Sequence, residues 1–292
     1  MKVNITKNHN KFFILSAILL TISVGALLFR GLNMGIDFIG GTIVQIDLNQ
    51  EFETSDIRGF TDKFDESADI TYAGEDRFQM IISTKVDLDE DQRAQLIDDL
   101  TENYGDDTEV LSIDNVSATI GNELKAQAIL AVGVAILGML VYITFRFEFL
   151  FGIAAIIALV HDVIIVLGVY AIFGIQVNTP FIAAVLTILG YSINDTIVVF
   201  DRIRENRGKY KRNDFVSLVD NSIHQTLRRS INTSLTTILA ISALYFVGVQ
   251  SIKDFTLPMI IGFLSGTYSS IFIASSFWYV IKEKRMTDIK VK

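Results

Sequence analysis

Long apolar stretches alternate with short polar segments along most of this chain. Six of the stretches are long enough for a bilayer-spanning helix, which needs ~20 residues. They cover residues 12–29, 126–145, 149–173, 181–200, 231–249 and 255–281. The first has the position of a signal peptide, but it is long, lacks an Ala-x-Ala cleavage site and ends at Arg30. We therefore expect it to be retained as an anchor, which gives six transmembrane helices.

The overall composition agrees with this pattern. Half of the residues are hydrophobic, and the mean hydropathy is +0.43. These values indicate a polytopic α-helical membrane protein rather than a soluble enzyme. Cysteine is absent, which excludes disulfides and thiolate metal sites.

Acidic residues are concentrated in the polar segment between the first two apolar stretches. Of the 33 Asp and Glu residues, 23 lie between residues 31 and 125. This predicts an acidic, water-exposed domain inserted into a membrane chain. Nucleic-acid binding is not expected, because it needs a basic surface.

The pattern inside segment 31–125 switches between strand and helix periodicity. Strands are predicted at 42–48, 70–73, 78–84 and 110–116, and amphipathic helices at 55–66 and 88–104. This β-α-β-β-α-β order is that of an α+β, ferredoxin-like domain. The segment has no His or Cys, and we interpret its scattered acids as a solvated surface rather than a cation site.

Lysine and arginine in the short loops predict the orientation. They cluster before the first span, after the second, between the fourth and fifth, and in the tail after residue 281. Six spans place all four segments on one side, so both termini are expected in the cytoplasm and segment 31–125 outside. The predicted organisation is therefore 1–30 (N-terminus and first span), 31–125 (outer domain) and 126–292 (spans two to six). The last part contains a basic cytoplasmic loop, 201–230, in which 213–229 has the pattern of an interfacial amphipathic helix.

One carboxylate, Asp195, lies inside the fourth apolar stretch. A charge at membrane depth costs ~2.5–3.5 kcal/mol or more, so such residues usually carry protons, pair with ions or contact substrate. Arg229 enters the fifth span from the same side, and its long side chain could reach Asp195. The residues alone leave two alternatives open: a static ion pair, or a carboxyl that gains and loses a proton.

Other polar residues accompany Asp195 in the spans. They are Asp162, Asn194, Arg228, Asn232, Thr233 and Thr236. We interpret the hydroxyl-rich start of the fifth span as the lining of a polar crevice, and Gly262, Gly266 and Ser270 with the nearby Ser265 and Ser269 as a helix-packing surface. Asp162 could neutralise an arginine, relay a proton or cap packing, of which we favour a structural use. An intramembrane aspartyl protease is not expected, because neither acid follows a Gly-x-Gly motif.

Several motifs resemble those of the SecF family, the accessory membrane subunits of bacterial protein export. The most specific is GYSINDTIVVFDRIREN at 190–206. Others are GIDFIGG at 35–41, FRFE at 145–148, HD at 161–162, QTLRRS at 225–230, TSLTT at 233–237 and GTYSSIF at 266–272. One departure is SATIGNEL at 117–124, where the family usually has a Val-Gly-Pro opening. In the motif after the first span, the matching residues are Gly35, Asp37, Phe38, Gly40 and Gly41.

The resemblance implies a function and a set of partners. It implies a heterodimer with SecD beside the SecYEG channel, often with YajC, in the bacterial cytoplasmic membrane. Such a protein would use the proton motive force to promote late, ATP-independent translocation of unfolded preproteins, with protons as coupling ion and no cofactor. By the same resemblance, Asp195 is the proton-path acid and Arg229 its partner. Alternatives are a structural stabiliser of SecD and SecYEG without its own proton relay, and a small-molecule exporter.

Overall fold

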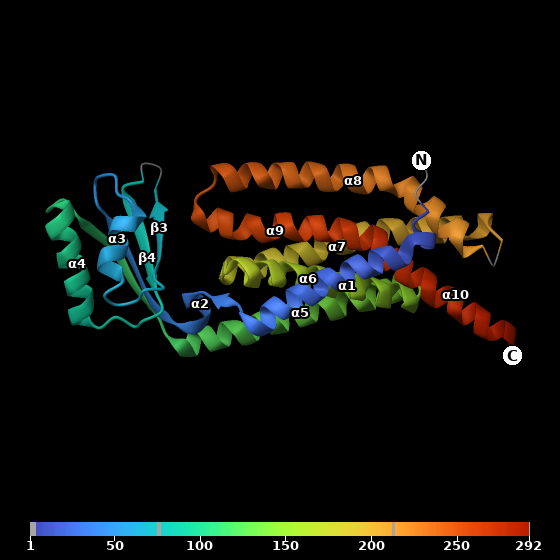
Figure 1. The fold of residues 1–292 in the computed structure, drawn as a ribbon, viewed down its shortest axis with the longest axis horizontal. Helices are drawn as coiled ribbons and strands as arrows, with labels where there is room; N and C mark the ends of the chain where they lie inside the picture. The colour runs from blue at the N-terminus through green and yellow to red at the C-terminus, as the bar shows by residue number, and fades with distance from the viewer. Residues whose placement is uncertain (1–3, 75–76, 212–213, 292) are drawn as a thin grey trace.

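The computed structural model describes residues 4–74, 77–211 and 214–291. The molecule is elongated: a bundle of long helices has a small sheet domain at one end and both chain termini at the other (Figure 1). The sheet domain is formed by the chain between the first two long helices.

Six helices are long and apolar enough to cross a membrane. The first consists of η1 (Thr6–Asn8) and α1 (His9–Phe29), and the next four are α5 (Ala118–Arg146), α6 (Phe149–Phe173), α7 (Thr179–Asn206) and α8 (Phe215–Val247). The sixth runs through α9 (Gln250–Tyr268), the π-helical segment η3 (Ser269–Ala274) and α10 (Ser275–Val291). The six predicted spans are therefore confirmed as helices, most of them longer than their apolar stretches.

Two of the long helices, α5 and α7, start at a side chain that caps their first turn. Asn178 accepts a hydrogen bond from the Phe181 N–H at the start of α7, where Pro180 occupies the first turn. Ser117 caps α5 in the same way. Such caps satisfy N–H groups that have no partner within the helix.

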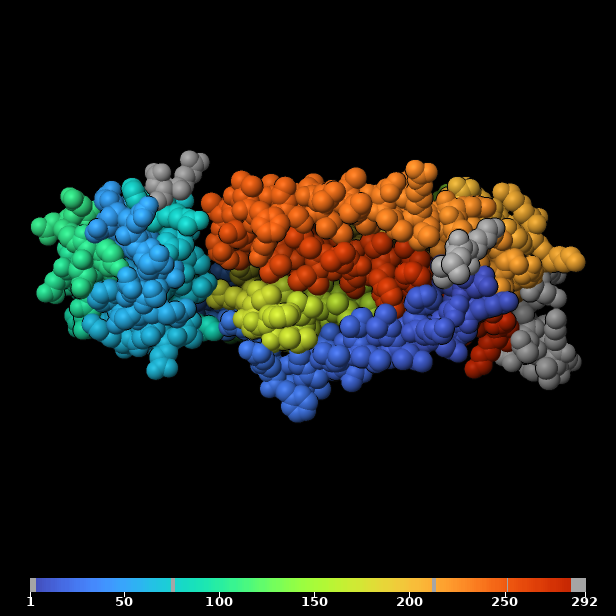
Figure 2. Space-filling model, turned by 45° about the horizontal axis from the view of Figure 1, so that its top comes forward, coloured from blue at the N-terminus to red at the C-terminus, as the bar shows by residue number. Residues whose placement is uncertain are grey.

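The centre of the bundle is formed by α6, α7 and the sixth helix. Their buried side chains include Phe151 and Trp278, whose rings stack with centroids 4.7 Å apart. In contrast, α1, α5 and α8 expose many large apolar side chains, such as Ile129, Leu137 and Leu239. Figure 2 shows α8 along the outside of the bundle, with the sheet domain beyond its end. Large exposed apolar surfaces of this kind require lipid or another protein to cover them.

The sheet domain has its elements in the order β-α-β-β-α-β. They are β2 (Gly41–Asp47), α3 (Thr54–Thr61), β3 (Asp69–Ala73), β4 (Gln79–Thr84), α4 (Glu90–Tyr104) and β5 (Glu109–Val116). The strands lie in the order β3-β4-β2-β5, and all neighbours are antiparallel. Alternate residues such as Val44, Ile46 and Ile82 are buried with Leu96 and Leu100 of α4. The helices α3 and α4 lie on the side of the sheet away from the bundle (Figure 1).

A short joint connects the sheet domain to the bundle. There β1 (Asn33–Met34) pairs in parallel with β6 (Gln176–Val177), and α2 (Ile36–Ile39) leads into Gly40 and Gly41. Gly40 has φ +88° and Gly41 has φ +146°, and a Cβ on Gly41 would lie 2.0 Å from the Thr84 carbonyl oxygen. Only glycine fits this backbone path, which gives the paired glycines a physical role.

The segment predicted as a basic loop, 201–230, is mostly helical. The helix α7 continues to Asn206, η2 covers Arg207–Lys209, and α8 begins at Phe215 and includes most of the fifth span in a single helix. No Gly or Pro interrupts residues 215–247, so nothing ends the helix at the predicted boundary. Leu218, Val219 and Ile223 are buried in the bundle core. The interpretation of 213–229 as an interfacial helix is therefore wrong for the described residues 214–229, because their apolar face packs on the protein.

Candidate functional site

Asp195 is buried where three helices meet. Its side chain, on α7, is 5% exposed. The Ser234 hydroxyl on α8 lies 3.5 Å from Asp195 Oδ2, and the Thr267 hydroxyl on α9 donates to Ser234 Oγ at 2.6 Å. The carboxyl group thus ends a short chain of hydroxyls that crosses from α9 to α7.

Arg229 lies near this group without touching it. No ion pair within 4.0 Å joins Arg229 to Asp195, although both belong to the described residues. The reason is helical geometry: Ser230 and Ser234 lie one turn apart on the buried side of α8, and Arg229 is rotated away from them by ~100°. Arg229 and Arg228 are both exposed.

The Arg229 side chain lines a polar hollow at the end of the bundle that carries the termini. The hollow has a volume of about 350 Å³, and its charged lining residues are Arg146, Asp201, Arg202, Glu205 and Arg229. Asp195 is not part of its lining. Water in this hollow would reach to within a few residues of Asp195 along α7.

Most of the other predicted polar residues of the fourth and fifth spans face outward. Asn194 and Asn232 are exposed, as is Thr236, whose hydroxyl bonds carbonyl groups of its own helix. Thr233 is half-buried and also bonds its own helix, at the Arg229 carbonyl. Within this subunit Asn232 and Thr236 therefore lie on the outer face of α8, and their role as crevice lining stays a prediction.

The inward positions of α8 are taken instead by other hydroxyl residues. Ser234 contacts Asp195, and Thr237 lies 2.5 Å from the Tyr191 hydroxyl. Both residues belong to the hydroxyl-rich start of the fifth span, but the sequence pattern did not single them out.

Asp162 is the best-connected carboxylate in the bundle. It is fully buried on α6 and accepts hydrogen bonds of 2.7 Å from Ser192 on α7, Ser265 on α9 and Ser269 on η3. His161 Nδ1 lies 3.1 Å from Asp162 Oδ1, the oxygen that also accepts from Ser265. Ser265 and Ser269 were interpreted as packing residues, but they also donate to this acid. The bonds tie three of the six long helices together.

The motif after the first span lies at the other end of α7. Asp37 Oδ2 accepts a hydrogen bond from the Thr179 N–H, 2.8 Å away, at the first turn of α7. Gly35 donates its N–H to the Val177 carbonyl, and Phe38 is buried in the bundle core. Since α7 rises ~1.5 Å per residue, this joint is ~24 Å from Asp195. Gly35, Asp37, Phe38, Gly40 and Gly41 therefore hold the sheet domain on the helix that carries Asp195.

An ionic cluster closes the end of the bundle that carries the termini. Glu148, in the turn between α5 and α6, accepts hydrogen bonds from Arg207 and from Lys282, the latter at 2.8 Å. Burial would raise the pKa of Glu148, but the Lys282 and Arg207 cations outweigh it and hold the pKa below its ordinary value. Among the described residues, no group of three or more His, Cys, Asp or Glu side chains could hold a metal ion.

Two family models match the chain. The model for the C-terminal region of the protein export membrane proteins SecD and SecF matches residues 96–284, and the SecD/SecF GG motif matches residues 25–51. The second match includes the glycine pair of the joint.

Curated relatives match over nearly the full chain. A protein translocase subunit SecF of Desulfurispirillum indicum is 42% identical over 89% of this chain and 85% of its own length. The SecF subunit of Sebaldella termitidis is 36% identical over 97% of this chain and 92% of its own. These relatives are named as translocase subunits, not as enzymes.

A solved structure shares the fold. The crystal structure of SecDF, a translocon-associated membrane protein from Thermus thermophilus, superposes with a TM-score of 0.83 at 36% identity. The match covers 98% of this chain and 39% of that one, so the chain corresponds to less than half of the solved protein. With the family models and the curated relatives, this likeness shows that the chain belongs to the SecD/SecF family of protein export membrane proteins, as a SecF-type translocase subunit.

Proposed function

We propose that this subunit uses proton movement through its helical bundle to promote a late step of preprotein translocation, together with SecD. The observation that carries the proposal is Asp195, a buried carboxyl group that has a hydroxyl neighbour and no cation within 4.0 Å in the described structure. A permanently charged, unpaired carboxylate at membrane depth is costly. A carboxyl that alternates between charged and neutral forms avoids a permanent cost and can carry a proton.

The surroundings of Asp195 support a proton route. On one side, the hollow lined by Arg229, Asp201 and Glu205 offers a polar approach from the end that carries the termini. On the other, Ser234 and Thr267 link the carboxyl group to the sixth helix. Moving one charge through the membrane field is worth ~2.3 kcal/mol per 100 mV, so repeated cycles could drive a motion of these helices.

We place the protein in the bacterial cytoplasmic membrane with both termini in the cytoplasm. The positive-inside rule supports this. The end of α7 and the following η2, which carry Arg202, Arg204, Arg207 and Lys209, lie at the end of the bundle where both termini lie (Figure 1). The sheet domain is then extracytoplasmic. We assign it to the ferredoxin-like class on its element and strand order.

We propose that SecD covers one face of α7. The exposed positions there are Ala183, Thr187, Gly190 and Asn194, which recur every three or four residues, and a Cβ on Gly190 would meet nothing within 4 Å. Small residues in such a row allow close helix approach, and Asn194 needs a polar partner in an apolar setting. The solved relatives are SecDF proteins, which supports a SecD partner. SecYEG, YajC and unfolded preproteins remain further proposed partners.

Asp195→Asn tests the proposal, since asparagine keeps the size and hydrogen bonding of aspartate but carries no proton. We expect the variant to lose the part of preprotein export that depends on the proton motive force, at unchanged levels of SecD and of this subunit. If that export persists, the second candidate function, structural support of SecD and the channel, replaces the first. The bonds of Asp162 to three helical segments favour some structural contribution in either case.

A further inference from the structure

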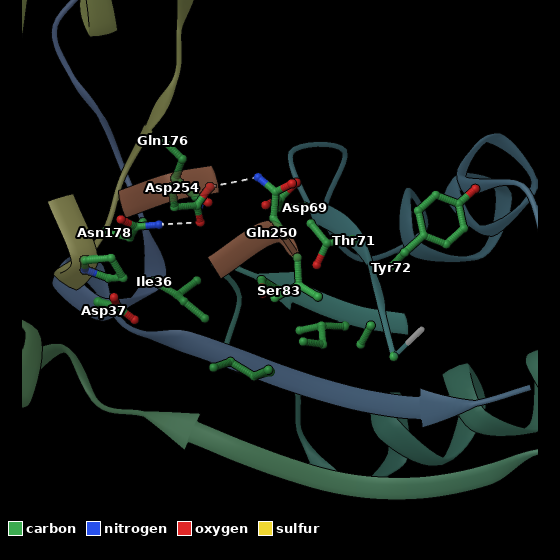
Figure 3. Close-up of a pocket in the computed structure, with 17 residues that line it drawn as sticks. Ile36, Asp37, Asp69, Thr71, Tyr72, Ser83, Gln176, Asn178, Gln250 and Asp254 are labelled. Atoms are coloured by element: carbon green, nitrogen blue, oxygen red, sulfur yellow. Dashed lines mark hydrogen bonds between the residues drawn. The ribbon is translucent and has the colours of Figure 1, made fainter. Parts of the chain in front are cut away.

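A cleft separates the sheet domain from the bundle. It has a volume of about 320 Å³ and is lined on one side by the sheet face that α3 and α4 leave uncovered, including Ile43, Thr71 and Ser83 (Figure 3). The starts of α7 and α9 form the other side, with Asn178 and Asp254. The size is at the lower end of the range for ligand sites in proteins.

The charged groups that line the cleft are all acidic. They are Asp37 from the joint, Asp69 from β3 and Asp254 from α9. None forms an ion pair within 4.0 Å among the described residues. Asp254 accepts hydrogen bonds of 2.7 Å from the neutral amides of Asn178 and Gln250, which Figure 3 shows. Like charges that line one cleft repel each other.

The pKa of Asp69 is raised, as expected for a carboxyl group whose burial is not fully offset by nearby positive charge. Burial raises it, and Arg58 and Lys85, which lie nearby on the neighbouring surface, only partly oppose the rise. A cation inside the cleft would therefore gain three acidic neighbours and relieve their mutual repulsion.

The cleft also borders a free strand edge. In the sheet, β3 is an outer strand and pairs only with β4. In the described structure, the backbone of Asp69–Ala73 makes no hydrogen bond beyond that ladder. Such an edge can add an extended peptide through main-chain hydrogen bonds, which do not depend on the peptide's sequence.

We propose that this cleft and the β3 edge bind an extended, lysine- or arginine-bearing segment of unfolded polypeptide. The strand edge would supply backbone bonds to any sequence, and the three carboxylates would favour positively charged segments. This inference rests on the proposed role in preprotein translocation and specifies its contact surface.

Peptide binding to the full-length protein in detergent tests the proposal. The probe is a fluorescent, unstructured peptide that carries lysines, compared with the same peptide in which glutamine replaces each lysine. Asp69→Asn with Asp254→Asn should weaken binding of the lysine peptide at least ~threefold, as expected for the loss of one or two partly exposed ion pairs. The matched control is Asp98→Asn with Glu102→Gln, which removes the same charge from exposed positions of α4 and should change nothing.

A photo-crosslinking residue gives an independent measurement. Placed at Thr71 it should capture the peptide, and placed at exposed Ala94 on α4 it should not. Three outcomes would overturn the proposal. Both double variants could lose binding equally, both peptides could bind equally well, or the peptide could be captured preferentially at Ala94. Peptide binding needs no proton gradient, so these outcomes are separate from the Asp195→Asn export result.

Discussion

Asp195 and Ser234 face each other across the contact between α7 and α8, with 3.5 Å between the carboxylate and the hydroxyl oxygen. Ser234 in turn accepts from Thr267. The acid of the fourth span is thus joined to the fifth and sixth helices by hydroxyl groups, and the arginine expected as its partner lies on an adjacent face of α8.

Replacing Ser234 by alanine should impair the proton-driven step. The change removes the hydroxyl next to Asp195 and leaves Thr267 without that partner. We expect export that depends on the proton motive force to fall about threefold to tenfold, which corresponds to ~0.7–1.4 kcal/mol and is within the range of one hydrogen bond. Thr236→Ala, two residues away on the exposed side, should have no effect. Equal effects of the two variants would argue against a role for Ser234.

Asp162→Ala should destabilise the helical bundle. Three serine hydroxyls lose their acceptor, and hydrogen bonds between membrane helices contribute ~0.6 kcal/mol each, so we expect a loss of about 2 kcal/mol. Thermal unfolding in detergent measures this. Ser269→Ala should cost less than half as much, and Thr187→Ala, whose hydroxyl bonds only its own helix, should cost little. An unchanged melting temperature for Asp162→Ala would contradict the structural role.

Gly41→Ala should disrupt the joint between the two parts of the molecule. The added Cβ would collide with the Thr84 carbonyl oxygen, and φ at this position is +146°. The expected cost is about 3 kcal/mol or more, measured as loss of folded sheet domain by limited proteolysis. Gly59→Ala is the matched control, because it lies in helix α3 with nothing within 4 Å of the new Cβ. The Gly59→Ala variant should be as stable as the parent or more stable by ~0.5–1 kcal/mol. Similar proteolysis of both variants would contradict a specific steric requirement for glycine at position 41.

Glu148→Gln should make stability less dependent on pH in the acid range. The folded-state pKa of Glu148 lies below its ordinary value of ~4.3 because of Lys282 and Arg207. The negative charge therefore stabilises the fold at neutral pH, and this stabilisation is lost as the pH falls through the folded-state pKa. The side chain is 39% exposed, so screening limits the contribution to about 1 kcal/mol or less. Melting temperatures of parent and variant should differ at pH 7 and low salt. They should converge once the pH falls below the folded-state pKa of Glu148, or at high salt. A constant difference across pH would contradict the ion-pair explanation.

Gly190→Leu should weaken association with SecD. The larger side chain would fill the open position on α7 and hold a partner helix away. Co-purification of the two subunits measures the effect. Gly25→Leu serves as the control, since Gly25 on α1 is equally open but lies outside the proposed contact face. If SecD is recovered normally with the Gly190→Leu variant, the contact with SecD does not lie on this face of α7.

Much of the architecture could be predicted from local sequence patterns. The six long helices follow from uninterrupted apolar runs, and the order of strands and helices in 31–125 follows from the change between period 2 and period 3.6. Asp195 and Asp162 were identifiable because a carboxyl group stands out inside an apolar run. These features need only neighbouring residues to be recognised.

Side-chain contacts between helices could not be predicted in this way. The choice between Arg229 and Ser234 beside Asp195 depends on the rotation of α8 about its axis, and a single residue step turns a side chain by ~100°. The three serines of Asp162 come from α7, α9 and η3, which are far apart in sequence. The paired β1 and β6 strands have only two residues each, too short for any periodic signal.

The sequence by itself determined that this chain spans a membrane six times, carries an acidic α+β insert and has carboxyl groups in its spans, because hydropathy and periodicity are properties of consecutive residues. Only the tertiary structure decided which polar groups meet: Ser234 at Asp195, three serines at Asp162, and Asp37, Asp69 and Asp254 around one cleft. The physical reason is that these contacts depend on helix rotation and packing, which are fixed by the whole core and not by the residues at each position.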